Sequence, residues 1–148
     1  MWNHINIVKA IVAGLLGTAV MTAFMLMAPL MGMPPMNIGE MLGSMMGGIT
    51  SLGWVMHFMI GTVLAIGYAA IFATRLPGPP AARGAIFSLI PWLMAQVVVM
   101  PMMGAGFFSG SMLVAGGSLV AHLIFGVVVG GVYGTEAKAR TGRLVPQT

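Results

Sequence analysis

Four long apolar runs dominate the sequence and leave few folds open to it. They extend over about residues 5–31, 49–73, 84–103 and 112–133. Each is long enough to cross the roughly 30 Å hydrocarbon core of a bilayer, which takes about 20 helical residues. Lipid satisfies no backbone hydrogen bonds and four strands cannot close a barrel, so the runs are predicted to be helices. We therefore expect an all-α membrane protein, a bundle of four transmembrane helices forming one domain over residues 1–134.

The composition agrees with a protein whose main solvent is lipid. Charged residues make up 5% of the chain, against about 25% in an average soluble domain. The lipid bilayer is therefore the expected partner. The first apolar run is longer than the 7–15 residues of a signal-peptide core, so we expect it to act as a membrane anchor. Cysteine is absent, which excludes disulfides, iron–sulfur clusters and covalently attached c-type haem.

All six basic residues fall on one side of the predicted bundle. They lie at the start of the first run, around the second connection and after the last run, and the other two connections contain neither Lys nor Arg. By the positive-inside rule, both termini and a polar tail at residues 135–148 are expected in the cytoplasm, below a bacterial inner (plasma) membrane. This placement explains the positive net charge, so no nucleic-acid partner is expected. The basic residues are Lys9, Arg75, Arg83, Lys138, Arg140 and Arg143.

The second and fourth apolar runs resemble each other around a histidine. His57 is followed by Gly61 four residues later, and His122 by Gly126, and a tyrosine comes eleven residues after each histidine. The first and third runs also share similar endings rich in Pro and Met. The chain is thus predicted to contain two tandem helical hairpins related by an axis along the membrane normal, which places the two histidines at similar depth.

The two hairpins are expected at about residues 5–73 and 84–133, with different connections at their outer ends. In the first of these connections, Asn37 is followed three residues later by Glu40, a loose form of the capping box that begins a helix. The apolar residues after Asn37 have helical spacing. We expect a short helix that lies at the outer membrane interface.

His57 and His122 are the leading candidates for a binding site. An ionisable side chain within a membrane span is costly and marks a functional site by default. Neutral imidazole binds haem and metals. At 100° per residue each histidine shares a helix face with its glycine, Gly61 or Gly126, which leaves room for a flat macrocycle. These four residues predict a b-type haem with two axial histidines, and the alternative is hydrogen bonding between helices without a cofactor.

Methionine is the second candidate for binding chemistry. The chain has 17 methionines, most of them around the two outer connections. Thioethers are soft ligands that select Cu(I), so this outer cluster and the histidines together predict a copper site. Methionine also fills gaps in apolar cores, which is the alternative interpretation. The candidate metal ligands are His57, His122, Met31, Met33, Met36, Met45 and Met56.

No pattern in the sequence indicates an enzyme. The apolar runs contain no acidic residue, and no Gly-rich phosphate loop or zinc motif is present. Glycines at helical spacing allow close packing within the chain, with other membrane subunits or with a second copy. We predict a small integral membrane subunit or accessory protein of a respiratory or other redox complex, without independent catalytic activity. The alternatives are a copper-handling membrane protein, and a small transporter or binder of a lipid-soluble ligand.

A compact four-helix length and two short segments carry a family resemblance. The segments are Pro-Leu-Met-Gly at 29–32 and Met-His-Phe-Met-Ile-Gly at 56–61. In these features the chain resembles small four-helix bacterial integral membrane proteins of unknown function. The resemblance implies the fold and the membrane location, and it carries no activity, cofactor or partner with it.

Overall fold

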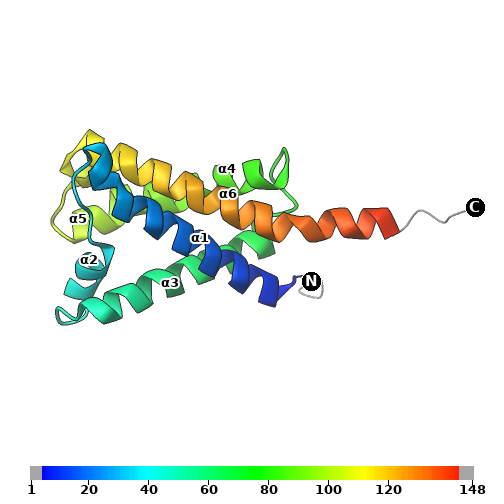
Figure 1. Cartoon of the computed structure of the whole chain (residues 1–148), viewed down its shortest axis with the longest axis horizontal. Helices are drawn as coiled ribbons and strands as arrows, with labels where there is room; N and C mark the ends of the chain where they lie inside the picture. Colours follow the sequence, from blue (N-terminus) through cyan, green and yellow to red (C-terminus); the bar gives the residue numbers. More distant parts are fainter. Residues whose placement is uncertain (1–4, 144–148) are drawn as a thin grey trace, which may run out of the picture.

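The computed structural model describes the backbone of residues 5–143 and the side chains of residues 5–134, and this part of the chain is helical with no strand (Figure 1). Four helical stretches are long and apolar enough to cross a membrane. They confirm the predicted all-α fold with four candidate spans. The stretches are Ile7–Met31, Thr50–Phe72, Pro80–Met102 and Met112–Gly134.

The first hairpin begins with helix α1 (Ile7–Met27), whose N-terminus is capped by the Asn6 side chain. A 3-10 turn, η1 (Ala28–Met31), follows α1 and ends at Gly32 with a left-handed φ of 82°. The predicted short helix is present as α2 (Ile38–Ser44), where the Asn37 side chain accepts a hydrogen bond of 3.1 Å from the Glu40 amide. Its placement at a membrane interface stays a prediction.

Two of the long helices widen into a π-helix along their length. Helix α3 (Thr50–Gly67) continues as η2 (Tyr68–Phe72), where the Ala73 amide donates to the Tyr68 carbonyl five residues earlier. Helix α4 continues in the same way as η3, although by the repeat its counterpart in the first hairpin is α1 and not α3. Single-turn π segments of this kind are frequent at functional sites. The ranges in the second hairpin are α4 (Pro80–Met94), η3 (Ala95–Val99), α5 (Met100–Met102), the 3-10 turn η4 (Phe107–Gly110) and α6 (Met112–Arg143).

Helices α1 and α6 pack against each other in the middle of the bundle, with α3 on the far side of α1 and α4 on the far side of α6. Small residues permit these close approaches. A side-chain carbon at Gly14 would lie 2.8 Å from the Thr62 Cα atom of α3, and one at Gly84 would overlap the carbonyl oxygen of Gly126 in α6. Helix α2 covers the beginning of α3.

The hairpin repeat is only partly reflected in the packing. The α1–α3 and α4–α6 contacts correspond to each other, but the α1–α6 interface has no counterpart between α3 and α4. The outer helices meet at the η2 end, where Phe87 contacts Tyr68 and Phe72 at ring distances of 5.3 and 5.1 Å. Helix α1 accepts two neighbours through Gly14, which faces α3, and Gly17, which faces Phe125 and Val129 of α6, while α6 meets α4 through its own glycines.

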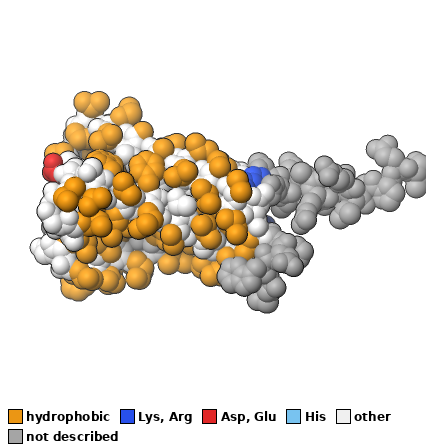
Figure 2. Space-filling model, turned by 90° about the horizontal axis from the view of Figure 1, so that it is seen from below, with side chains coloured by type: hydrophobic (Ala, Val, Ile, Leu, Met, Phe, Trp, Pro, Cys, Tyr) orange, Lys and Arg blue, Asp and Glu red, His pale blue; other side chains and the backbone are white. Residues whose placement is uncertain are grey.

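Both ends of the described chain lie at one end of the bundle, here called the termini end, and α2 lies at the other, the α2 end (Figure 1). Apolar side chains cover much of the surface between them, with acidic and basic side chains at opposite ends (Figure 2). Lys9, Arg75 and Arg83 come from segments at the termini end, and Glu40 from α2. Side chains of the predicted tail at 135–148 lie outside the described residues, although the α6 backbone is helical to Arg143.

Candidate functional site

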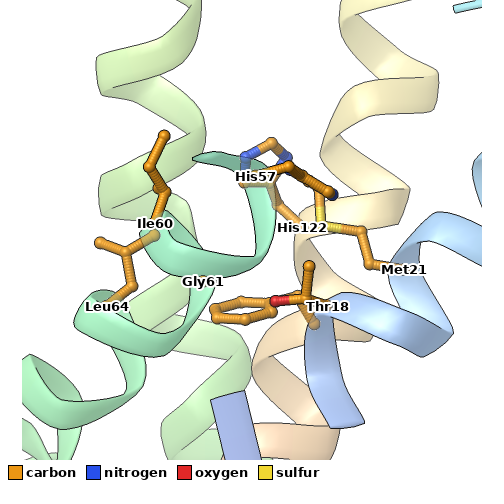
Figure 3. A pocket seen from close by; sticks show the side chains of 8 residues that line it. Thr18, Met21, His57, Ile60, Gly61, Leu64 and His122 are labelled. Carbon is orange, nitrogen blue, oxygen red and sulfur yellow. The ribbon is translucent and has the colours of Figure 1, made fainter. Parts of the chain in front are cut away.

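His57 and His122 line the same small cavity, which lies where α1, α3 and α6 meet (Figure 3). The cavity has a volume of about 70 Å³. Helix α1 contributes Thr18 and Met21, which are both buried. The structure thus brings together the two histidines that the sequence analysis singled out. The remaining lining residues are Ile60, Gly61, Leu64 and Phe125.

Close packing of α1 on α3 places His57 beside α1. Gly61 lies one turn after His57, and a side-chain carbon there would overlap the Thr18 hydroxyl oxygen. That hydroxyl donates a 2.8 Å hydrogen bond to the Gly14 carbonyl within α1, so it adds no unpaired group to the interface. Gly61 therefore serves the site by letting α1 approach α3.

A hydrogen bond joins His57 to α1. The Thr22 hydroxyl donates to the Thr18 carbonyl at 2.7 Å, and its oxygen lies 3.1 Å from His57 Nε2. Because Thr22 engages Nε2, Nδ1 is the ring nitrogen of His57 without a hydrogen-bond partner among the described residues. The rings of Trp54 and Phe58 flank His57 at 6.2 and 5.9 Å.

His122 is held by a hydrogen bond within its own helix. Its Nδ1 lies 2.7 Å from the backbone oxygen of Ser118, and because a carbonyl can only accept, Nδ1 carries the proton. The free lone pair is therefore on Nε2. Within the described residues, Arg83 Nε is the one buried side-chain nitrogen or oxygen without a hydrogen-bond partner. The free nitrogens of both histidines are consequently open to the cavity or the surface.

The volume of the cavity limits what it can hold. About 70 Å³ is half the roughly 150 Å³ of a cavity that admits benzene, and far below the 300–1,000 Å³ of pockets for larger ligands. Gly126 does not line the cavity, because α4 packs on it through Gly84 and Ser88. A metal ion or a few waters fit in a cavity of this volume, whereas haem would extend well beyond it.

The five methionines that the sequence singled out as metal ligands do not line this cavity. Met31 and Met45 are exposed, while Met33 reaches Gly117 of α6 and Met36 packs on the apolar core. Met56 lies in α3 and is half-buried. A shallow groove of about 580 Å³ at the α2 end has Met41 and Met103 in its lining instead.

The methionine that reaches the histidines is Met21, which sequence reasoning passed over because it lies outside the two outer clusters. One sequence feature could have indicated Met21. It lies on one face of the first apolar run, where the residues at helical spacing are Thr18, Met21, Thr22 and Met25. Ser118 could have been found as the polar residue one turn before His122. Thr22 pairs with a histidine on another helix, and no local pattern indicates such a contact.

The acid and thiol side chains that often complete metal sites are missing from this region. In the part of the chain with described side chains, no group of three or more His, Cys, Asp and Glu residues comes together. The donors present are two neutral imidazoles and one thioether. A metal held here would be bound by soft and borderline ligands alone.

The chain matches a family of unknown function, DUF6789, over residues 5–143 and therefore belongs to that family. This agrees with the predicted resemblance to proteins of unknown function, while a bacterial origin stays a prediction. No curated protein and no solved structure matches the chain.

Proposed function

We propose that this member of the DUF6789 family is a small integral membrane protein that binds one copper(I) ion between His57, His122 and Met21. The observation that supports the proposal is that two histidines and a buried thioether line one cavity of about 70 Å³, and that each histidine has one ring nitrogen without a hydrogen-bond partner among the described residues. The small volume favours an ion over an organic cofactor.

The donor set favours copper(I) among the common metals. Thioether and imidazole ligands suit Cu(I), whereas Mg²⁺ and Ca²⁺ require oxygen ligands and structural zinc sites use four Cys or His ligands. Metal-bound histidines characteristically donate their second ring N–H to a fixed acceptor. Thr22 and the Ser118 carbonyl provide that acceptor for His57 and His122.

The four candidate spans support a multi-pass membrane location, which we assign to a bacterial inner membrane. The apolar surface between the two ends is what a bilayer would cover, and the described basic side chains come from segments at the termini end. In this orientation both termini face the cytoplasm. The two histidines then lie within the bilayer, where an ionisable group is retained for function.

We assign the protein an accessory role beside a redox complex of the membrane, for which it would hold copper rather than catalyse a reaction. A soft three-ligand site inside a bilayer suits storage or delivery of Cu(I) to a partner membrane subunit. Haem binding by the histidine pair is the second candidate. Haem would use the same two ring nitrogens as ligands. The small cavity volume argues against haem and equally against a lipid-soluble organic ligand.

A copper titration of the purified protein in lipid nanodiscs tests the site. With a chromophoric Cu(I) chelator as competitor, we expect one tightly bound ion per chain. His57→Ala and His122→Ala should each lower the affinity at least 100-fold, and Met21→Leu about tenfold, because each removes a ligand. Met45→Leu is the matched control, since Met45 is exposed and far along the chain from the cavity.

Two results would overturn the copper assignment. One is binding that survives both histidine substitutions but is lost with the outer methionines, which would move the site to the α2 end. The other is a Soret band with sharp α and β bands on reduction of the gently solubilised protein. That spectrum would identify haem as the ligand of His57 and His122.

A further inference from the structure

A line of hydrogen-bonded polar side chains runs from the η4 turn to Ser118, whose hydroxyl lies beside His122. The Ser109 hydroxyl donates to Gln96 Oε1 at 2.9 Å, and Gln96 Nε2 donates to the Ser118 hydroxyl oxygen at 3.2 Å. That oxygen lies 3.5 Å from His122 Nδ1. The line therefore runs from the α2 end of the bundle to the back of a histidine that lines the cavity.

Gln96 is the centre of this line and is out of place in an apolar helix. Its side chain is 1% exposed, and it lies in the π-helical segment η3 of α4. Burying an amide is costly unless both its ends are hydrogen-bonded. Ser109 and Ser118 satisfy one end each, so the line is complete only while the η4 turn stays in place.

The η4 turn is held in a strained conformation. Phe108 and Ser109 are consecutive non-glycine residues with positive φ, at 52° and 57°. Left-handed backbone at such residues is unfavourable and persists when surrounding contacts hold it. Here the contacts are the Ser109–Gln96 hydrogen bond and the packing of the Phe108 ring on Trp92 at 6.1 Å.

One holding contact attaches η4 to α4 and the other attaches it to η3, and a glycine lies at each end of the turn. Gly106 and Gly110 flank it with φ values of 75° and 62°, which glycine adopts without strain. Trp92 is itself fixed, because its indole N–H donates to the Ala115 carbonyl of α6 at 3.1 Å. If η4 lifts away, Gln96 and Ser118 lose their cover toward the α2 end.

We propose that Ser109, Gln96 and Ser118 form a polar entry route from the α2 end to His122, and that the Phe108–Ser109 turn is its gate. The inference rests on the proposed function only for the identity of the ion that travels. Strain in the turn favours opening, and its two contacts with α4 and η3 favour closure. Water and small cations would reach the histidine pair from the α2 side when the turn opens.

Cysteine labelling tests the route without any metal, because the natural chain contains no cysteine. Ser118→Cys in proteoliposomes would be treated with a small, membrane-impermeant, cationic methanethiosulfonate reagent applied to one side at a time. We expect slow labelling from the α2 side only. Adding Ser109→Ala, which leaves the buried Gln96 oxygen without its donor, should speed that labelling about tenfold.

Three matched variants distinguish gate opening from general loosening. Met112→Cys, at a residue that is 76% exposed, should be labelled rapidly from the α2 side with or without Ser109→Ala. Ala121→Cys, at a fully buried position of α6, should stay unlabelled. Ser44→Ala, which removes an exposed hydroxyl of α2, should leave labelling of Ser118→Cys unchanged.

The proposal is overturned if Ser109→Ala does not change the labelling rate of Ser118→Cys, or if the reagent reacts only from the termini side. If Ser109→Ala does not fold, Phe108→Ala replaces it, because that change loosens the turn without touching the buried amide. Labelling as expected in a protein that fails to bind copper would retain the route and reject the copper site. Copper binding by a protein whose labelling rate does not respond to Ser109→Ala would retain the copper site and reject the route.

Discussion

Gly126 provides the sharpest test of how α6 is built, because two interpretations of this residue differ. In the first interpretation Gly126 leaves space for haem, so a methyl group added at this residue would be tolerated when no cofactor is bound. In the structure it is instead the point where α4 packs on α6. A side-chain carbon at Gly126 would overlap the Gly84 carbonyl oxygen and lie 2.7 Å from the Ser88 Cβ atom.

The expected loss of stability on Gly126→Ala follows from these contacts. Carbon atoms in contact are normally 3.5–4.0 Å apart, so Gly126→Ala forces α4 and α6 apart by about 1 Å. Overpacking of this kind costs about 1–3 kcal/mol. Gly131→Ala on the same helix meets nothing within 4 Å, and it should stabilise the helix by up to about 1 kcal/mol, the difference in helix propensity.

The assay is equilibrium unfolding of the two variants in mixed micelles, with SDS as denaturant and helix content followed by circular dichroism. We expect Gly126→Ala to be less stable than Gly131→Ala by about 2 kcal/mol or more. Equal free energies of unfolding for the two variants would refute the packing argument. They would also restore Gly126 as a residue available to a ligand.

Three further predictions concern the site, the short helix and the orientation. Thr22→Val removes the hydrogen-bond partner of His57 Nε2 and should weaken copper(I) binding about 10–100-fold, while Thr22→Ser should retain it; equal affinities in a chelator competition would contradict a role of this hydrogen bond in the site. Asn37→Ala removes the cap of α2 and should raise hydrogen exchange of the α2 amides about fivefold, from a loss of about 1 kcal/mol; unchanged exchange would show that packing on α3 suffices. A cysteine replacing Pro77 should react only from the cytoplasmic side in whole-cell labelling and one replacing Ser44 only from outside; the opposite pattern would reverse the proposed topology.

The sequence by itself determined the secondary structure and the distribution of charge. Runs of apolar residues long enough to cross a bilayer can only satisfy their backbone as helices, so the four candidate spans were readable from hydropathy. Asn37 and Glu40 marked the beginning of α2 in the same local way, because a cap depends on residues within one turn. The two histidines also stood out, since a polar residue in an apolar helix is conspicuous wherever the helix packs.

Tertiary structure alone decided which faces of these helices meet. Small residues let α1 pack on both α3 and α6 and let α6 pack on α4, and the α1–α6 interface has no counterpart between α3 and α4. The same packing put Met21, rather than the outer methionines, beside the histidines, and it turned Gly126 toward α4. The hydrogen bond of His57 followed from it, because Thr22 is 35 residues from His57 along the chain and reaches it only where α1 and α3 touch. Contacts between helices depend on complementary surfaces distant in sequence, whereas hydropathy and capping depend on residues within a few turns.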